Sequence, residues 1–223
     1  MKEMLRSFRI FTAQYTLKVM LQTVLIMLGI YAVVSGLSFI SFDGSDFGEG
    51  FLMGFLPSFS LVIPICGSFM LNAIYSYNMQ INPGYKYMHS IKDSGRKYVQ
   101  AIIVGNMLSL VILGIAMFII WTMTTFLDVA LPPALSAILA LAVLSMINFT
   151  GNAKKQWTRF IAIMPLFILV GFFSGFSSAA EEDNNPIPEF VVWICLAVAV
   201  VAFIASLIYT IKTSEKKWRR DEI

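Results

Sequence analysis

Residue types that carry out catalysis are scarce in this chain, and their spacing matches no common active site. The single histidine, His89, lies in a polar stretch, while Ser174 lies in the run Gly-Phe-Phe-Ser-Gly. A serine nucleophile needs a general base within reach, and this run lacks the Gly-x-Ser-Gly spacing of intramembrane serine proteases. Cys66 and Cys195 lie in apolar runs without a Cys-x-x-Cys pair, where cysteine behaves as a small hydrophobic residue. We therefore expect no enzyme activity in this chain.

Sites for metals and nucleotides are also not indicated. Asp43, Asp46 and Glu49 are close in sequence, but their spacing does not match a calcium-binding EF-hand loop, so calcium is disfavoured. No Gly-x-x-x-x-Gly-Lys-Ser/Thr loop is present, so the chain cannot bind ATP in that way. We expect no cofactor in this chain. If ATP drives it, ATP and magnesium are bound by another polypeptide.

The elements that hold these residues are long and apolar. The chain has 223 residues, of which 58% are hydrophobic and 13% charged, and about 20 apolar helical residues cross the ~30 Å hydrocarbon core of a bilayer. The sequence predicts an all-α integral membrane protein with six transmembrane helices in a single domain, residues 1–223. The predicted spans are residues 20–40, 51–72, 99–121, 130–149, 160–176 and 190–211.

Charge divides cleanly between the two sides of these spans. All sixteen lysines and arginines precede the first span, follow the sixth, or lie between the second and third or the fourth and fifth. Short basic loops stay in the cytosol, so the sequence predicts a multi-pass protein of the cell membrane with both termini cytoplasmic. Anionic membrane lipid explains this basic surface more simply than nucleic acid does. The opposite loops hold only acidic charges: Asp43, Asp46, Glu49, Asp128, Glu181, Glu182, Asp183 and Glu189.

Amphipathic and polar segments flank the spans. Met4, Phe8, Phe11 and Tyr15 recur at helical spacing, which predicts an interfacial elbow helix over residues 1–18; a frayed extension of the first span is the alternative. Residues 212–223 form a predicted basic cytosolic tail. Inside the spans the polar groups are amides and hydroxyls rather than charges, so proton- or sodium-driven transport is disfavoured. Most of these groups are expected to form hydrogen bonds between helices.

Residues 82–98 form the longest polar interruption of the chain. Asn82-Pro83-Gly84 is a strong turn signal, so a short helix is expected to begin near Tyr85 and to be broken by Asp93-Ser94-Gly95. An ordinary basic loop is the alternative. The short helix comprises Tyr85, Lys86, Tyr87, Met88, His89, Ser90 and Ile91, and the turn after it comprises Asp93, Ser94, Gly95 and Arg96.

At residues 88–99 the chain resembles membrane subunits of ABC transporters of the type-2 exporter class. Those subunits carry a cytosolic coupling helix between the second and third spans, often ending in a pattern like (R)SLPISRxxIVxxK. Ser90 and Ser94 match its serines, and Ile91 stands for its leucine. The six spans, cytosolic termini and elbow helix extend the resemblance over the whole chain.

The chain departs from that pattern at two positions, where Lys92 replaces the proline and Asp93 replaces an apolar residue. The resemblance implies that the helix at residues 85–91 docks a cytosolic ABC ATPase, and that a second permease copy or a homologous permease completes the transporter. It implies export of an amphipathic or lipophilic cargo, as in exporters of antimicrobial peptides or phenol-soluble modulins. A non-transporting accessory, sensor or assembly protein is the alternative.

Overall fold

Helices make up every element that can be described in the chain. The computed structural model describes residues 2–12, 15–41, 46–81, 93–126, 133–150 and 189–219. This part of the chain contains no strand. Its helices are α1 (Lys2–Phe11), α2 (Thr16–Ser41), α3 (Asp46–Ile81), α5 (Ser94–Phe126), α6 (Pro133–Thr150) and α8 (Glu189–Arg219).

Four of these helices are long and apolar enough to cross a membrane. Their apolar windows are Thr16–Gly36, Ser60–Met79, Ser94–Met123 and Phe190–Ser214, and the shortest has 20 residues. At 1.5 Å per residue that window rises about 30 Å, the thickness of the hydrocarbon core. These helices are compatible with a multi-pass membrane protein. Helix α6 is apolar but shorter, and the predicted span at residues 160–176 lies outside the described residues.

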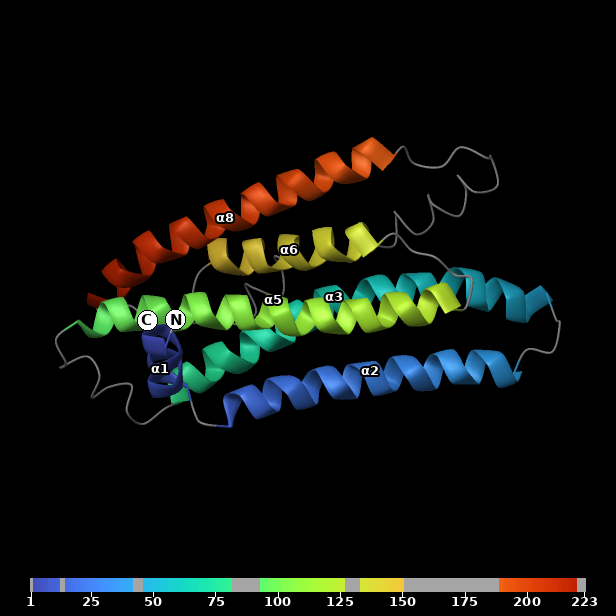
Figure 1. Cartoon of the computed structure of the whole chain (residues 1–223), viewed down its shortest axis with the longest axis horizontal. Coiled ribbons are helices and arrows are strands. Elements are labelled where there is room, and N and C mark those ends of the chain that lie inside the picture. Colours follow the sequence, from blue (N-terminus) through green and yellow to red (C-terminus); the bar gives the residue numbers. More distant parts are fainter. Residues whose placement is uncertain are drawn as a thin grey trace.

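Helix α3 lies in the middle of the bundle, in contact with α2, α5 and α6 (Figure 1). Of the residues in its apolar window, 61% are buried, whereas only 17% are buried in the windows of α2 and of α8. Leu61 and Ile65 of α3 pack with Val143 and Ile147 of α6. The outer helices therefore present most of their apolar surface outward, as side chains that face lipid do.

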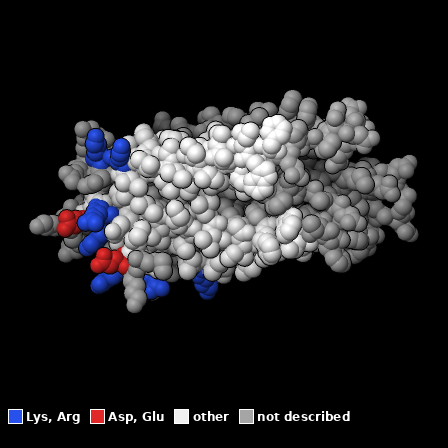
Figure 2. All heavy atoms as spheres, turned by 45° about the horizontal axis from the view of Figure 1, so that its top comes forward, with Lys and Arg blue, Asp and Glu red and all other residues white. Residues whose placement is uncertain are grey.

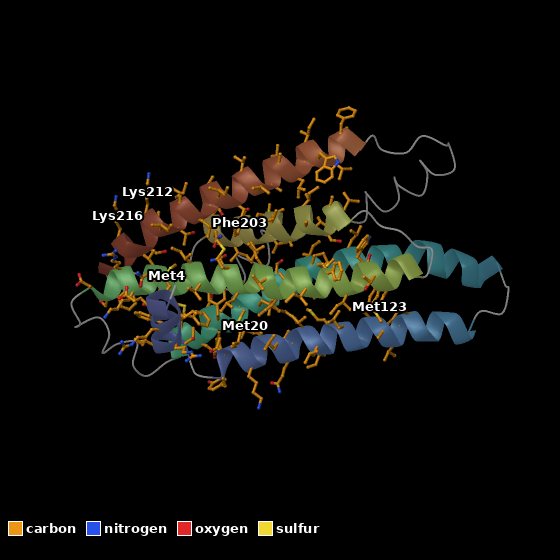
Figure 3. All side chains as sticks on the ribbon, viewed as in Figure 1. Met4, Met20, Met123, Phe203, Lys212 and Lys216 are labelled. Atoms are coloured by element: carbon orange, nitrogen blue, oxygen red, sulfur yellow. The ribbon has the colours of Figure 1, made fainter. Side chains whose placement is uncertain are left out.

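Helices α6 and α8 lie side by side and run in the same direction (Figure 1). Phe203 of α8 is buried, and it lies between the two helices (Figure 3). The Asn148 amide donates a hydrogen bond to Ser206 Oγ at 3.3 Å, and Thr210 Oγ1 donates to the Asn148 carbonyl at 3.2 Å.

The prediction that most polar groups in the spans bond between helices is wrong for three of the hydroxyls, whereas Ser68 Oγ of α3 does donate across to the Ala140 carbonyl of α6. Ser35, Ser109 and Ser145 each donate to a carbonyl four residues earlier in their own helix. A short hydroxyl side chain reaches that carbonyl more easily than a neighbouring helix. The longer amides of Asn106 and Asn148 do bridge helices.

Several helix ends differ from their predicted positions. The first helix ends at Phe11, so Tyr15 does not continue its buried face and is 57% exposed. Helix α3 begins at Asp46, within the expected outer loop, and α5 begins at Ser94 rather than at residue 99. Helix α8 continues to Arg219, so most of the predicted basic tail is helical.

Most charged residues gather toward one end of the molecule, on the face that Figure 2 shows, with basic atoms also visible farther along its lower edge, and the described surface beyond these is uncharged. Lys212 and Lys216 of α8 point away from the bundle at this end (Figure 3). Helix α1 lies at the same end, across the direction of the long helices (Figure 1). We call this the basic end of the bundle.

Candidate functional site at the basic end of the bundle

Three aromatic side chains from three helices meet at the basic end. The rings of Tyr98 (α5) and Trp218 (α8) stack with centroids 4.6 Å apart and planes 25° apart. Phe11 of α1 meets both edge-on, 5.7 Å from Tyr98 and 5.5 Å from Trp218. None of the three is more than 3% exposed. Edge-to-face and offset stacked rings are the favourable arrangements, and we call this group the aromatic clamp.

A hydrogen bond fixes the orientation of the indole in the clamp. Trp218 Nε1 donates to Ser94 Oγ at 2.9 Å, and both residues are buried. A buried indole N–H needs an acceptor, because an unpaired donor is costly. Ser94 is the first residue of α5, so this bond ties the C-terminal end of α8 to the start of α5.

Asp93 sets the point at which α5 begins. Its φ angle is 64°, in the left-handed region, which aspartate tolerates better than most residues. Its carbonyl accepts a hydrogen bond from the Lys97 N–H at 3.2 Å, so Asp93 occupies the cap position of the helix. The reversed backbone turns the chain sharply as it leaves residues 82–92 and enters α5.

Helix α1 is held against α5 by a polar contact as well as by the clamp. Ser7 Oγ donates a hydrogen bond to Gln100 Oε1 at 2.9 Å. Phe8 of α1 and Met20 of α2 belong to the same buried cluster, and Met4 is partly buried against that cluster; Figure 3 labels Met4 and Met20 at this end. Glu3 in the first turn of α1 and Arg9 in its last turn complement the helix dipole.

Positive charge surrounds the clamp on the outside. The described basic side chains of α1, α5 and α8 are exposed. Among the side chains that the structure describes on these three helices and at the turn before α5, the exposed acidic ones are Glu3 and Asp93. A surface of this kind suits anionic groups, such as lipid headgroups or an acidic partner surface. Its basic residues are Arg6, Arg9, Arg96, Lys97, Lys212 and Lys216.

The structure describes only part of the predicted loop site. The helix predicted over Tyr85, Lys86, Tyr87, Met88, His89, Ser90 and Ile91 lies outside the described residues. Asp93 lies in a turn, whereas Ser94, Gly95 and Arg96 form the first turn of α5. The described end of the loop therefore joins directly onto the aromatic clamp through Ser94.

A second polar group lies deeper between α3 and α5. The Tyr75 hydroxyl accepts hydrogen bonds from Asn72 Nδ2 at 2.7 Å and from Asn106 Nδ2 at 3.1 Å. The Tyr75 ring lies against Gly105, where an added Cβ would come within 2.8 Å of a ring carbon. Asn106 Oδ1 is buried without a hydrogen-bond partner. We call Asn72, Tyr75 and Asn106 the α3–α5 polar node.

The contacts at the basic end hold helices together and do not form a recognisable catalytic or metal-binding group among the described residues. They consist of stacked rings, apolar packing and neutral hydrogen bonds, and no three His, Cys, Asp or Glu residues of the described part lie close enough to hold a metal ion. Packed side chains and hydrogen bonds of this kind transmit displacement between elements. The arrangement can therefore make α1, α5 and α8 move together.

The sequence does not indicate the aromatic clamp. Trp218 falls in the predicted basic cytosolic tail, residues 212–223, and Tyr98 is the last residue of the polar stretch at residues 82–98. An available signal was the Trp in the run Lys-Lys-Trp-Arg-Arg, because a large aromatic residue among charges often marks a buried or interfacial anchor. Its partners Phe11 and Ser94 are distant in sequence, so they could not be read from it.

Comparisons of this chain with known protein families, curated proteins and solved structures found no match.

Proposed function

We propose that this chain is the permease subunit of an ABC transporter of the type-2 exporter class, powered by a separate cytosolic ATPase. The observation that carries the proposal is the joining of α1, α5 and α8 at the basic end, directly beside the loop at residues 82–92. Such a transporter needs a cytosolic loop that the ATPase can displace and a rigid connection from that loop to the membrane-spanning helices. The clamp supplies the connection.

The mechanism follows from the chain's connectivity. A partner that displaced residues 85–91 would pull on Asp93 and thus on the first turn of α5. Because the clamp ties that turn to Trp218 and Phe11, the displacement would move α5, α8 and α1 as one body. Rigid-body motion of packed helices is a common way to convert a local event into a change of access. In this mechanism, the partner ATPase closes when it binds ATP, and this closure drives the motion of the helices.

Orientation and cargo follow from charge and polarity. The exposed basic residues beside α1 favour a cytosolic basic end, in keeping with the positive-inside rule, and α1 fits an elbow helix at the membrane interface. The described spans contain no Asp or Glu among their buried residues, and an uncharged interior suits an amphipathic or lipophilic cargo better than an ion or a sugar. The plasma membrane is the proposed location.

A co-purification experiment tests the proposal. The chain is expressed with its candidate ATPase, and Tyr87, Met88 and Ile91 are each changed to aspartate. We expect these variants to lose stimulation of ATP hydrolysis by cargo, while Tyr15→Ala, a change of an exposed residue that follows α1, retains it. If the aspartate variants bind and stimulate the ATPase normally, the assignment of the loop is wrong.

A non-transporting accessory or sensor protein remains the second candidate, and a labelling experiment separates the two. A single cysteine replaces Lys97, which is exposed in the first turns of α5, in a variant without Cys66 and Cys195. A permease predicts a maleimide labelling rate that changes when ATP and vanadate bind the complex. An accessory protein predicts the same rate with and without nucleotide.

A further inference from the structure

A cavity of about 380 Å³ lies between α3, α5 and α6, away from the aromatic clamp. Its α5 wall runs from Leu110 to Trp121, which corresponds to about 16 Å at 1.5 Å per residue. This stretch lies within the apolar window Ser94–Met123. The cavity is therefore elongated along the helices and lies in the part of the chain that suits a bilayer.

Small residues open this space. Gly114 of α5 and Ala137 of α6 lie on its walls, and an added Cβ at Gly114 would have no atom within 4 Å. Helix α6 packs mainly against α8 and α3 and makes less contact with α5. The side chains between α5 and α6 thus leave a gap that neither helix fills.

The walls differ in exposure from one side to the other. Leu113 and Ala140 at the inner side are buried, whereas Phe118, which also lines the cavity, is 61% exposed. The ring of Phe118 lies 5.9 Å from that of Trp121. Because Phe118 belongs both to the cavity wall and to the outer face of α5, the cavity lies next to the surface that would face lipid.

The chemistry of the walls defines the ligand class. Among the lining residues that the structure describes, nearly all are aliphatic or aromatic, and the polar side chains are the buried Ser60 and Ser136 together with the Trp121 indole. Apolar cavities stay dry, and lining atoms without neighbours lose dispersion contacts. A volume of this size is at the lower end of ligand sites. A slender apolar chain would restore those contacts.

We propose that this cavity binds one linear apolar chain, the acyl chain of a membrane lipid or of a single-chain amphiphile. The bound acyl chain would lie along α5, between Gly114 and the Phe118–Trp121 pair. The site does not depend on the proposed transporter activity, because it needs neither an ATPase nor nucleotide.

Fluorescence quenching tests the proposal. The purified protein is placed in phosphatidylcholine nanodiscs and titrated with 9,10-dibromostearic acid, because bromine quenches an indole that it touches. The signal of Trp121 is the difference between the protein and its Trp121→Phe variant. Trp193, which is 63% exposed on α8, reports ordinary contact with lipid through a Trp193→Phe variant.

We expect quenching of Trp121 to saturate and that of Trp193 to rise in proportion to the bromine present. Gly114→Leu fills the cavity and should weaken the Trp121 quenching several-fold. Gly29→Leu is the matched control, because Gly29 also has no atom within 4 Å of an added Cβ but lies on α2, away from the cavity. Ala137→Leu, on the α6 wall, is a second variant that should act as Gly114→Leu does.

A second titration, in which brominated phosphatidylcholine replaces the fatty acid, identifies the molecule that supplies the acyl chain. Saturable quenching by the phospholipid identifies a bilayer lipid, and saturation by the fatty acid alone identifies a single-chain amphiphile. If Trp121 is quenched in proportion to bromine in both titrations, and neither Gly114→Leu nor Ala137→Leu alters this, the proposal is overturned.

Discussion

Trp218 donates a hydrogen bond from its indole nitrogen to the hydroxyl of Ser94, over 2.9 Å and across 124 residues of sequence. The bond joins the end of α8 to the start of α5 at the point where the chain leaves the loop at residues 82–92. Phe11 packs edge-on against the same indole, so one side chain connects three helices. The three helices are thus in direct contact at one point.

Removal of the acceptor from this bond should destabilise the protein. Ser94→Ala removes the hydroxyl that accepts the hydrogen bond of the buried Trp218 N–H, which should lower the free energy of unfolding by about 1–3 kcal/mol. Reversible unfolding in mixed micelles measures this difference. Ser145→Ala is the control, because Ser145 is buried and bonds only to a carbonyl of its own helix; a loss as large as that of Ser94→Ala would contradict the special role of the Trp218 bond.

Combining two changes tests whether Ser94 and Trp218 act as a pair. Trp218→Phe keeps a ring for stacking but removes the N–H donor. When Ser94→Ala and Trp218→Phe are combined, the loss of stability should be smaller than the sum of the two single losses, by about 0.5–3 kcal/mol. Strictly additive losses would show that the two side chains do not interact in the membrane-embedded protein.

Truncation of Phe11 should release α1 from the bundle. Phe11 is 1% exposed, and large-to-small changes at buried phenylalanines cost about 3–5 kcal/mol. The measurement is maleimide labelling of a cysteine at Ser7, which is buried against Gln100, in a variant without Cys66 and Cys195. We expect Phe11→Ala to accelerate labelling many-fold.

Tyr15→Ala provides the matched control for that experiment, because Tyr15 follows α1 but is 57% exposed. Labelling at residue 7 should stay slow in this variant. Equal rates in Phe11→Ala and in the parent protein would mean that the clamp does not hold α1 in place.

Two glycines of α5 should respond to alanine in opposite directions. At Gly105 the new methyl group would meet the Tyr75 ring at 2.8 Å, so Gly105→Ala should separate α3 from α5 and lower the melting temperature. At Gly114 nothing lies within 4 Å, and alanine improves helix propensity by up to about 1 kcal/mol. Thermal melting of the two variants side by side checks this, and a similar fall in both would contradict the close α3–α5 contact.

The stability of the α3–α5 polar node should depend more on the Tyr75 hydroxyl, which accepts both hydrogen bonds, than on the Asn106 amide. Tyr75→Phe leaves the donors of Asn72 and Asn106 without their shared oxygen. Asn106→Leu removes one donor together with the buried Oδ1, which has no partner in the node. We expect Tyr75→Phe to be the more destabilising change by about 1 kcal/mol, because buried polar groups left unpaired are what costs free energy. Unfolding of both variants in mixed micelles tests the order.

The sequence alone determined the class of the fold, because apolar runs of span length and one-sided basic charge are properties of local composition. It also located the spans that α2, α3, α5 and α8 contain, with ends that differ from the apolar windows by up to nine residues. It did not determine the hydrogen bonds of the spans, because the reach of each side chain depends on how closely the helices pack. Gly105 is an example, because the Tyr75 ring of α3 occupies the space that a side chain at this position would need.

Only the tertiary structure placed Trp218, Tyr98 and Phe11 together. Each lies in a different segment, in a mixed polar and aromatic setting that reads as interface or tail, and no periodic pattern links residues so far apart. Their proximity follows from the parallel course of α6 and α8, which brings the C-terminal end of α8 to the start of α5. Periodicity reports which face of one helix is apolar; the packing of several helices decides which faces meet.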